Sequence, residues 1–231
     1  MRNFWSFTGN EKYDIGCTGQ TVYLYDKQGN EIAKFKDLPY AYMSAISPNG
    51  DIFVVKSTEG RLAVYSLESA ALVKKFRFSK VDGGQDENFC FSPDSTEFYN
   101  IERHVDCLKT ALSIYNTSDF SLKRRILNDD FSVVLNAIEY SQKTNEIFLL
   151  GYFRGENGVA SRFFVAKLEN DNLNHITTIP EKEFWFYRSY INLKMMGFTE
   201  KAHKWSYIKM KLEKLKNADY SLSELWSSYF K

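Results

Sequence analysis

The stretch AISPNGDIFVVKSTEGRLAVYSLESAALVKKF, residues 45–76, contains three short apolar runs separated by turn signals. The first run, residues 52–55, is β-branched and aromatic. The segment 47–50 before it is a typical turn, because proline fixes φ and Asn-Gly tolerates positive φ. Two further runs follow at 62–65 and 72–76. Together with the apolar residues before position 47, the pattern predicts four strands in an antiparallel meander.

Two features of this stretch recur along the chain in the same order. The turn segment has copies that read FTGNEKYDI at 7–15, ISPNGDIFV at 46–54, FSPDSTEFY at 91–99 and YSQKTNEIF at 140–148. The end of the third strand has copies that read VYLYD at 22–26, LAVYS at 62–66, LSIYN at 112–116 and, more weakly, FFVAK at 163–167. The spacing of roughly 40 to 50 residues, with four strands in each copy, is typical of β-propeller blades.

These two features carry a resemblance to the WD-repeat and WD-like propeller families, which covers residues 3 to about 180. The chain departs from true WD repeats because the Gly-His start is absent and Tyr-Asp, Tyr-Ser or Tyr-Asn stands in place of Trp-Asp. The resemblance implies an all-β fold, a small β-propeller of four to five four-stranded blades, and a role in binding other proteins.

The chain divides into three parts on these patterns. Residues 1–180 are predicted to form four blades, with strands near 3–7, 12–18, 21–26 and 31–36, near 42–46, 52–55, 62–65 and 72–76, near 88–92, 96–102, 110–115 and 121–127, and near 133–140, 145–152, 161–167 and 172–179. Residues 181–219 are predicted to be a degenerate fifth blade, because 184–191 have strand composition and 206–212 alternate, or alternatively a helical segment. Residues 220–231 are predicted to form a short amphipathic C-terminal helix that opens on a capping box at 221–224.

Composition narrows the class of protein. The 231 residues carry a net charge of +1 and only three cysteines, without metal-ligand spacing. A near-neutral chain is not drawn strongly to nucleic acid or to anionic membranes. The sequence contains neither a signal peptide nor an apolar run of about 18 residues. These features predict a cytoplasmic protein with no nucleic-acid or membrane partner.

Three basic clusters fall in the predicted fourth strands of the first three blades: Lys34 and Lys36; Lys74, Lys75 and Arg77; Lys123, Arg124 and Arg125. The fourth strand is the outer edge of a blade, where basic side chains discourage pairing with another edge. We therefore interpret these clusters as structural. The fourth strand of the fourth blade, 172–179, has no such cluster, so we expect its edge to be covered, for instance by the C-terminal helix.

The candidates for chemistry are few. His104, Asp106 and Cys107 share one loop, but three such close positions rarely converge on one metal ion or reaction centre. No phosphate-binding loop, nucleophile elbow or zinc-protease motif occurs. The sequence therefore predicts no catalytic residue, no metal site and no cofactor.

Propeller connectivity gathers the blade-to-blade crossings and the loops between second and third strands at one end of the fold. These loops are the longer ones, and function usually lies on loops that a rigid scaffold presents. Aromatic side chains are also enriched at binding hot spots. The predicted binding face comprises Tyr40, Tyr42, Asp82, Asp86, His104, Asp106, Arg154 and Trp185.

Two functions are compatible with these observations. The first is a non-catalytic propeller scaffold that presents a loop-lined face to a protein or peptide. The alternative is an enzyme, of hydrolase or lyase type, with its site in the axial pocket of the propeller. The chain is expected to be a monomer, or a dimer through the apolar side of the C-terminal helix, which carries Leu222, Leu225, Trp226, Tyr229 and Phe230.

Overall fold

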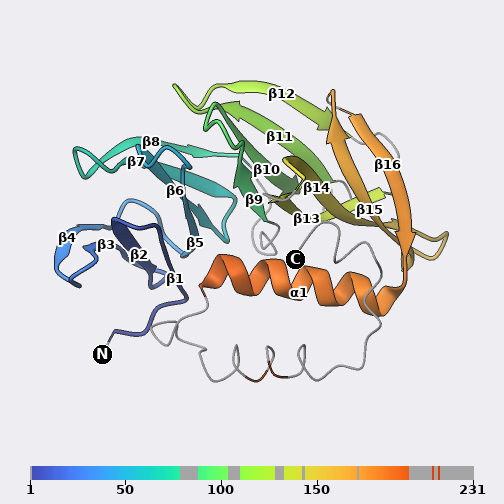
Figure 1. Cartoon of the computed structure of the whole chain (residues 1–231), viewed down its shortest axis with the longest axis horizontal. Coiled ribbons are helices and arrows are strands. Elements are labelled where there is room, and N and C mark those ends of the chain that lie inside the picture. Colours follow the sequence, from blue (N-terminus) through green and yellow to red (C-terminus); the bar gives the residue numbers. More distant parts are fainter. Residues whose placement is uncertain are drawn as a thin grey trace. The chain divides into compact units, whose positions relative to one another are not determined.

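The computed structural model describes residues 2–78, 88–103, 110–127, 133–141, 144–170, 172–197, 210 and 213. The strands within these ranges form four sheets of four strands each (Figure 1). The first sheet contains β1 (Ser6–Gly9), β2 (Tyr13–Cys17), β3 (Val22–Asp26) and β4 (Glu31–Phe35). The second contains β5 (Ala41–Ile46), β6 (Ile52–Ser57), β7 (Arg61–Ser66) and β8 (Ala71–Arg77). The third contains β9 (Phe89–Phe91), β10 (Glu97–Arg103), β11 (Thr110–Asn116) and β12 (Leu122–Leu127). The fourth contains β13 (Val133–Ser141), β14 (Glu146–Arg154), β15 (Ala160–Glu169) and β16 (Asn172–Ile179).

Every sheet is an antiparallel meander in which each strand pairs with the next one along the chain. The all-β class and the four predicted blades are therefore confirmed, and the strand boundaries agree with the prediction to within a few residues. The pairing between third and fourth strands shifts register once in each sheet, at Leu24/Tyr25, Val64/Tyr65, Ile114/Tyr115 and Val165/Lys167.

A buried serine anchors the turn between first and second strands in three of the sheets. In the second sheet, the Ser47 hydroxyl donates to Asn49 Oδ1 at 2.7 Å and accepts from the amide of Ile52 at 3.2 Å. The third sheet repeats this arrangement with Ser92, whose hydroxyl lies 2.6 Å from Asp94 Oδ1. In the fourth, Ser141 accepts from the amide of Thr144. The repeated turn seen in the sequence is thus a local hydrogen-bonded unit that starts the second strand of a blade.

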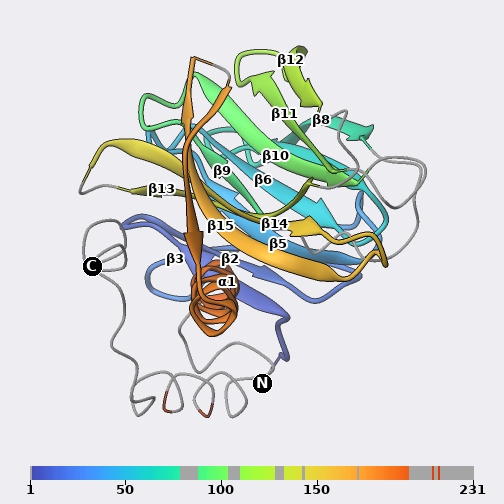
Figure 2. The same cartoon turned by 90° about the vertical axis from the view of Figure 1, so that its right-hand side faces the viewer.

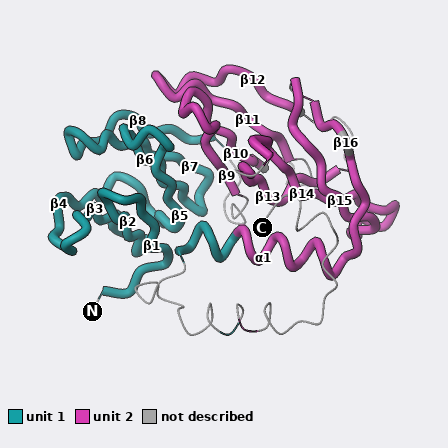
Figure 3. Tube along the Cα trace, viewed as in Figure 1, with its two compact units in different colours: residues 1–86, 192–212 teal, residues 87–191, 213–231 magenta. Residues whose placement is uncertain are grey.

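The four sheets are divided between two compact units, which Figure 3 distinguishes by colour. Unit 1 comprises Met1–Asp86 and Asn192–Leu212, and unit 2 comprises Glu87–Ile191 and Glu213–Lys231. In unit 1, side chains of the first and second sheets share one core, which includes Ile15, Leu24, Phe53 and Tyr65. In unit 2, the third and fourth sheets share another core, which includes Ile101, Leu112, Leu149 and Phe164.

Residues Glu181–Met196 form helix α1, so the strand expected over 184–191 is wrong. The aromatic composition suggested a strand, but Pro180 ends β16 and acidic Glu181 and Glu183 lie in the first helical turn, where they favour a helix N-terminus. The buried side chains of α1 pack on β14 and β15 in unit 2, beside which the helix lies in Figures 1 and 2. Met210 and Glu213 are also helical. The remainder of 198–219 and the C-terminal helix at 220–231 lie outside the described residues.

The basic residues of β12 pair with carboxylates of their own blade. Lys123 Nζ lies 2.6 Å and Arg124 Nη1 2.9 Å from Glu97 Oε1. Arg125 Nη2 lies 3.2 Å from Oε2 of Glu102, which is buried. The third blade therefore neutralises its cationic edge internally. In β16, by contrast, the side chains of Asn172 and 176–178 are exposed, so the covering that we expected over these residues is not found.

The pKa of Glu97 predicts an acid-sensitive step in unfolding. Burial alone would raise the pKa of this carboxyl, but hydrogen bonds from Lys123, Tyr99 and Arg124 outweigh burial and hold it at about 2. Because the folded-state pKa is depressed, the contribution to stability is complete above about pH 4.5 and is lost as the pH falls toward 2. We expect Glu97→Gln to lower the free energy of unfolding by about 1–3 kcal/mol at pH 7, and by much less near pH 2.

Urea titrations at both pH values measure this difference. Glu31→Gln is the matched control, since Glu31 pairs with Arg2 in an exposed bridge and should contribute less than about 1 kcal/mol. A loss at Glu97 that stays the same at both pH values would contradict the assignment.

The repeated tyrosine at the end of the third strand has a different environment in each of the first three blades. Tyr65 stacks on Phe53 at 4.8 Å, and its buried hydroxyl has no hydrogen-bond partner among the described residues. Tyr115 donates to Glu102 Oε1 at 2.5 Å. Tyr25 accepts from Arg2 Nη1 at 2.7 Å. At this repeat position, the tyrosine therefore packs against an aromatic ring in the second blade and donates a hydrogen bond to a carboxylate in the third.

Replacing these two buried tyrosines by phenylalanine should have opposite consequences. Tyr65→Phe removes an unsatisfied polar group, so we expect stability to stay equal or rise by up to about 1 kcal/mol. Tyr115→Phe leaves the buried carboxylate of Glu102 with one donor fewer, and should cost about 1–3 kcal/mol. Equilibrium urea unfolding compares the two variants directly. Equal losses in both would show that the hydroxyl of Tyr65 is satisfied like that of Tyr115.

Candidate functional site

The structure describes four of the eight residues predicted for the binding face. Tyr40 and Tyr42 lie at the crossing from β4 to β5 in unit 1, and Arg154 ends β14 in unit 2. Trp185 lies in α1, also in unit 2. Asp82, Asp86, His104 and Asp106 lie outside the described residues. Their gathering into one face therefore remains a prediction.

Tyr40 and Trp185 each present a large aromatic surface to solvent. Tyr40 is 60% exposed and has a φ of 54°, which is uncommon for an aromatic residue. Trp185 is 41% exposed, and its Nε1 donates to Glu181 Oε1 at 3.1 Å. The guanidinium of Arg188 lies 5.6 Å from the centre of the Trp185 ring. Both aromatics are thus accessible, and Trp185 is also held by its contacts with Glu181 and Arg188.

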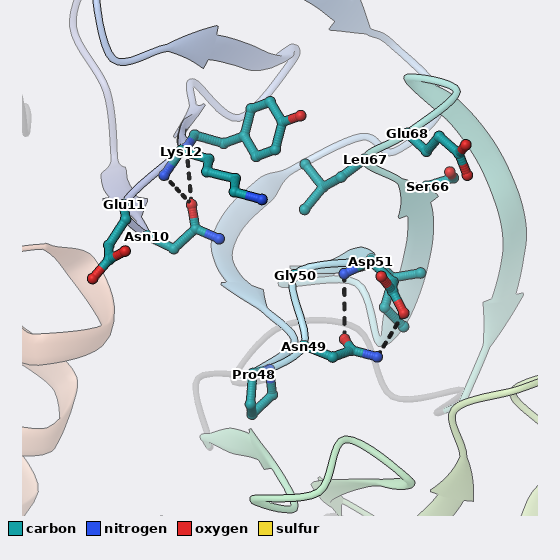
Figure 4. A pocket seen from close by; sticks show the side chains of 12 residues that line it. Asn10, Glu11, Lys12, Pro48, Asn49, Gly50, Asp51, Ser66, Leu67 and Glu68 are labelled. Carbon is teal, nitrogen blue, oxygen red and sulfur yellow. Dashed lines mark hydrogen bonds between the residues drawn. The ribbon is translucent and has the colours of Figure 1, made fainter.

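Unit 1 contains a pocket of about 740 Å³ (Figure 4). The pocket lies at the turn that follows β5, whereas Tyr40 directly precedes β5. Three turns enclose it: the turn between β1 and β2, the turn between β5 and β6, and the start of the turn between β7 and β8. The pocket is lined by Asn10, Glu11, Lys12, Tyr13, Pro48, Asn49, Gly50, Asp51, Ile52, Ser66, Leu67 and Glu68. None of the predicted site residues belongs to this lining.

The first-blade wall of the pocket presents hydrogen-bond donors from Asn10 and Lys12, and the carboxylate of Glu11, on the same turn, extends away from the Lys12 ammonium (Figure 4). The side-chain oxygen of Asn10 accepts from the amides of Lys12 and Tyr13, at 2.9 and 2.8 Å. These bonds fix the amide group so that its nitrogen is turned toward the cavity (Figure 4). The Asn10 nitrogen lies 3.8 Å from the point where a side chain on Gly50 would begin. The Lys12 ammonium extends into the same space (Figure 4).

The second-blade wall presents acceptors. Asn49 Nδ2 donates to Asp51 Oδ2 at 2.7 Å, and Asn49 Oδ1 accepts from the amide of Asp51 at 3.2 Å. Asn49 Oδ1 also accepts from the buried Ser47 hydroxyl, so Asp51 is linked to the turn anchor. The Asp51 carbonyl in turn accepts from the amide of Leu67 at 2.9 Å. Asp51 and Glu68 therefore stand on two turns that are joined by a main-chain hydrogen bond.

The charges that line the pocket do not neutralise one another. Glu11, Asp51 and Glu68 contribute carboxylates and Lys12 the ammonium. Among the described residues, none of these four side chains forms an ion pair within 4.0 Å. By contrast, the nearby Lys27 and Asp14 form an ion pair, with 2.6 Å between Lys27 Nζ and Asp14 Oδ1. The pocket thus offers unpaired groups of both signs to a ligand.

The sequence analysis did not predict this pocket, because it placed the binding face on the longer loops. The turns that form the pocket are short, and we interpreted them only as markers of the repeat. A signal was nonetheless present: Asn-Gly-Asp at 49–51 places an acid just after a serine-anchored turn, whereas the third blade has Asp-Ser-Thr at 94–96.

Other chemistry is sparse in the described part of the chain. No group of three or more His, Cys, Asp or Glu side chains there is placed to hold a metal ion. Burial raises the pKa of the Cys17 thiol to about 11, which keeps it protonated and unreactive at neutral pH. No helix in these residues is long and apolar enough to cross a membrane.

Solved structures resemble this chain in fold. A WD40 domain from Toxoplasma gondii coronin matches with a TM-score of 0.56 and 13% identity, over 76% of this chain and 45% of that chain. Kuenenia stuttgartiensis hydrazine synthase matches with a TM-score of 0.54 and 16% identity, over 71% and 53%. Dihydro-heme d1 dehydrogenase NirN in complex with DHE matches with a TM-score of 0.54 and 13% identity, over 78% and 36%.

No protein-family model matches the sequence, and no curated protein matches it. The chain spans between about a third and about a half of the length of the solved structures above. At these identities the similarity concerns the fold alone, and the proteins concerned include enzymes as well as a WD40 domain. Together with the four meander sheets, it supports the prediction of a small all-β propeller.

Proposed function

We propose that this protein is a non-catalytic propeller scaffold that binds a peptide segment of a partner protein in the pocket of unit 1. The observation that carries this proposal is the open polar lining of the pocket, mounted on three hydrogen-bonded turns. Donors on one wall and acceptors on the other suit a peptide, whose backbone supplies both kinds of group. The half-buried ring of Tyr13 adds surface for a ligand side chain to cover.

The rigidity of the lining also supports binding. Asn10 and Asn49 are held by bonds to their own turns, so a ligand would not have to order them. The longer loops, Tyr40 in unit 1 and Trp185 in unit 2 are further features that the same partner could contact. An enzyme with an axial site stays the alternative, since solved enzymes share the fold.

Selection from a random peptide library on the immobilised full chain tests the proposal. We expect a consensus peptide whose binding is abolished by Lys12→Trp, because the indole would fill the cavity into which Lys12 extends. Lys36→Trp is the control, since Lys36 is also exposed but follows β4 at the opposite end of the first sheet. Calorimetric titration of the selected peptide measures both variants.

Failure to select any peptide would overturn the proposal. So would a consensus peptide that binds Lys12→Trp and the unmodified chain equally well, because its site would then lie elsewhere on the molecule.

A further inference from the structure

We infer that the pocket selects a peptide segment in which a lysine or arginine side chain is followed closely by a carboxylate. This inference rests on the proposed function and names the ligand class of that same site. The ligand cation would face Asp51 and Glu68 on the second-blade wall. The ligand carboxylate would face Lys12 and Asn10 on the first-blade wall.

The carboxylate of Asp51 is held in place by its own turn. Asn49 and Asp94 occupy equivalent positions in the serine-anchored turns of the second and third blades. The side chain of each accepts one hydrogen bond from the serine hydroxyl and one from the main-chain amide two residues further on. Asn49 differs in having an amide nitrogen, and it uses this group to hold the Asp51 carboxylate at 2.7 Å. An aspartate at position 49 would instead repel Asp51. The second blade therefore carries an oriented anion that the third blade, with Thr96 at the equivalent place, lacks.

Among the described residues, this anion has no cationic partner of its own. In the third blade, by contrast, Glu97 is paired with Lys123 and Arg124. Asp51 and Glu68 have no ion pair within the described residues, although Lys12 lines the same cavity. A guanidinium or ammonium group between them would gain two charge-assisted hydrogen bonds. A neutral or purely acidic ligand would take these carboxylates out of water without repaying that cost.

The opposite, first-blade wall of the pocket favours a carboxylate of the ligand. Lys12 and the Asn10 amide nitrogen are donors on one turn, and the Asn10 oxygen is already occupied by main-chain amides. These groups favour an acceptor, and the charge on Lys12 favours a carboxylate over a neutral carbonyl. Because the two walls belong to different blades, the ligand must carry its opposite charges at separate positions. This requirement distinguishes a charge-patterned peptide from a simple basic one.

A double-mutant cycle on the selected peptide tests the inference. Asp51→Asn keeps an acceptor oxygen for Asn49 Nδ2 but removes the charge, so the turn is retained. We expect this variant to weaken binding about tenfold, a change of about 1.4 kcal/mol. A peptide whose basic residue is replaced by glutamine should also bind about tenfold more weakly. When both changes are combined, the fold-loss of affinity should be smaller than the product of the two separate fold-losses. Lys12→Gln should couple in the same way to the acidic residue of the peptide.

Glu156→Gln is the control, since Glu156 is an exposed carboxylate in the turn between β14 and β15 of unit 2. It should leave affinity unchanged, and unfolding midpoints verify that every variant is folded. The inference is overturned if the consensus lacks a basic residue, if Asp51→Asn binds as well as Glu156→Gln, or if the losses multiply independently. In each of these cases Lys12→Trp still abolishes binding if the proposed function is right, so the two failures are distinguishable.

Discussion

Much of this structure depends on one constraint. The turn between the first two strands of a blade contains a serine whose hydroxyl is buried, away from water. Ser47, Ser92 and Ser141 are all buried, so each hydroxyl must find its partners within its own turn. The resulting bonds fix the turn and deliver the chain into the second strand in register. In the second blade the same bonds also fix Asn49 and, through it, Asp51. The element that organises the blade thus orients the polar wall of the pocket.

The blades share the same four-stranded meander, but the side chains around the repeated tyrosine differ in chemistry from blade to blade. Aromatic rings surround the repeated tyrosine of the second blade: the ring centres of Phe35, from the first blade, and Phe53 lie 4.4 and 4.8 Å from that of Tyr65. The third blade places a buried carboxylate, Glu102, against Tyr115 and Arg125. A buried charge is tolerable only when it is paired, which explains why the basic residues of β12 turn inward to acids. Repeats that diverge in this way retain their strands while losing sequence similarity.

Much of the fold could be predicted from the sequence, because strand alternation and turn residues act locally and the repeat shows them several times. A helix over 181–219 was only the alternative prediction, because Phe184, Trp185, Phe186 and Tyr187 have strand composition. The acidic first turn of α1 favours a helix, and packing against β14 and β15 buries three of these four aromatic rings. The pocket was missed for another reason. It needs Asn10 and Asp51 to meet across two blades, and no local pattern reports that proximity. Of the predicted face, Tyr40 and Trp185 are exposed as expected, whereas their shared use in binding remains a prediction.

The central proposal is that the ligand binds in the pocket of unit 1. Amide chemical-shift mapping by NMR tests this location most directly. Titration of the selected peptide into the isotopically labelled chain should shift the amide signals of Asn10, Lys12, Asp51 and Leu67, which lie on the three turns around the pocket. Signals near Tyr40, at the other end of β5, should stay in place. Shifts confined to the region of Tyr40 or to α1 would contradict the account and place binding on the longer loops or the helix instead.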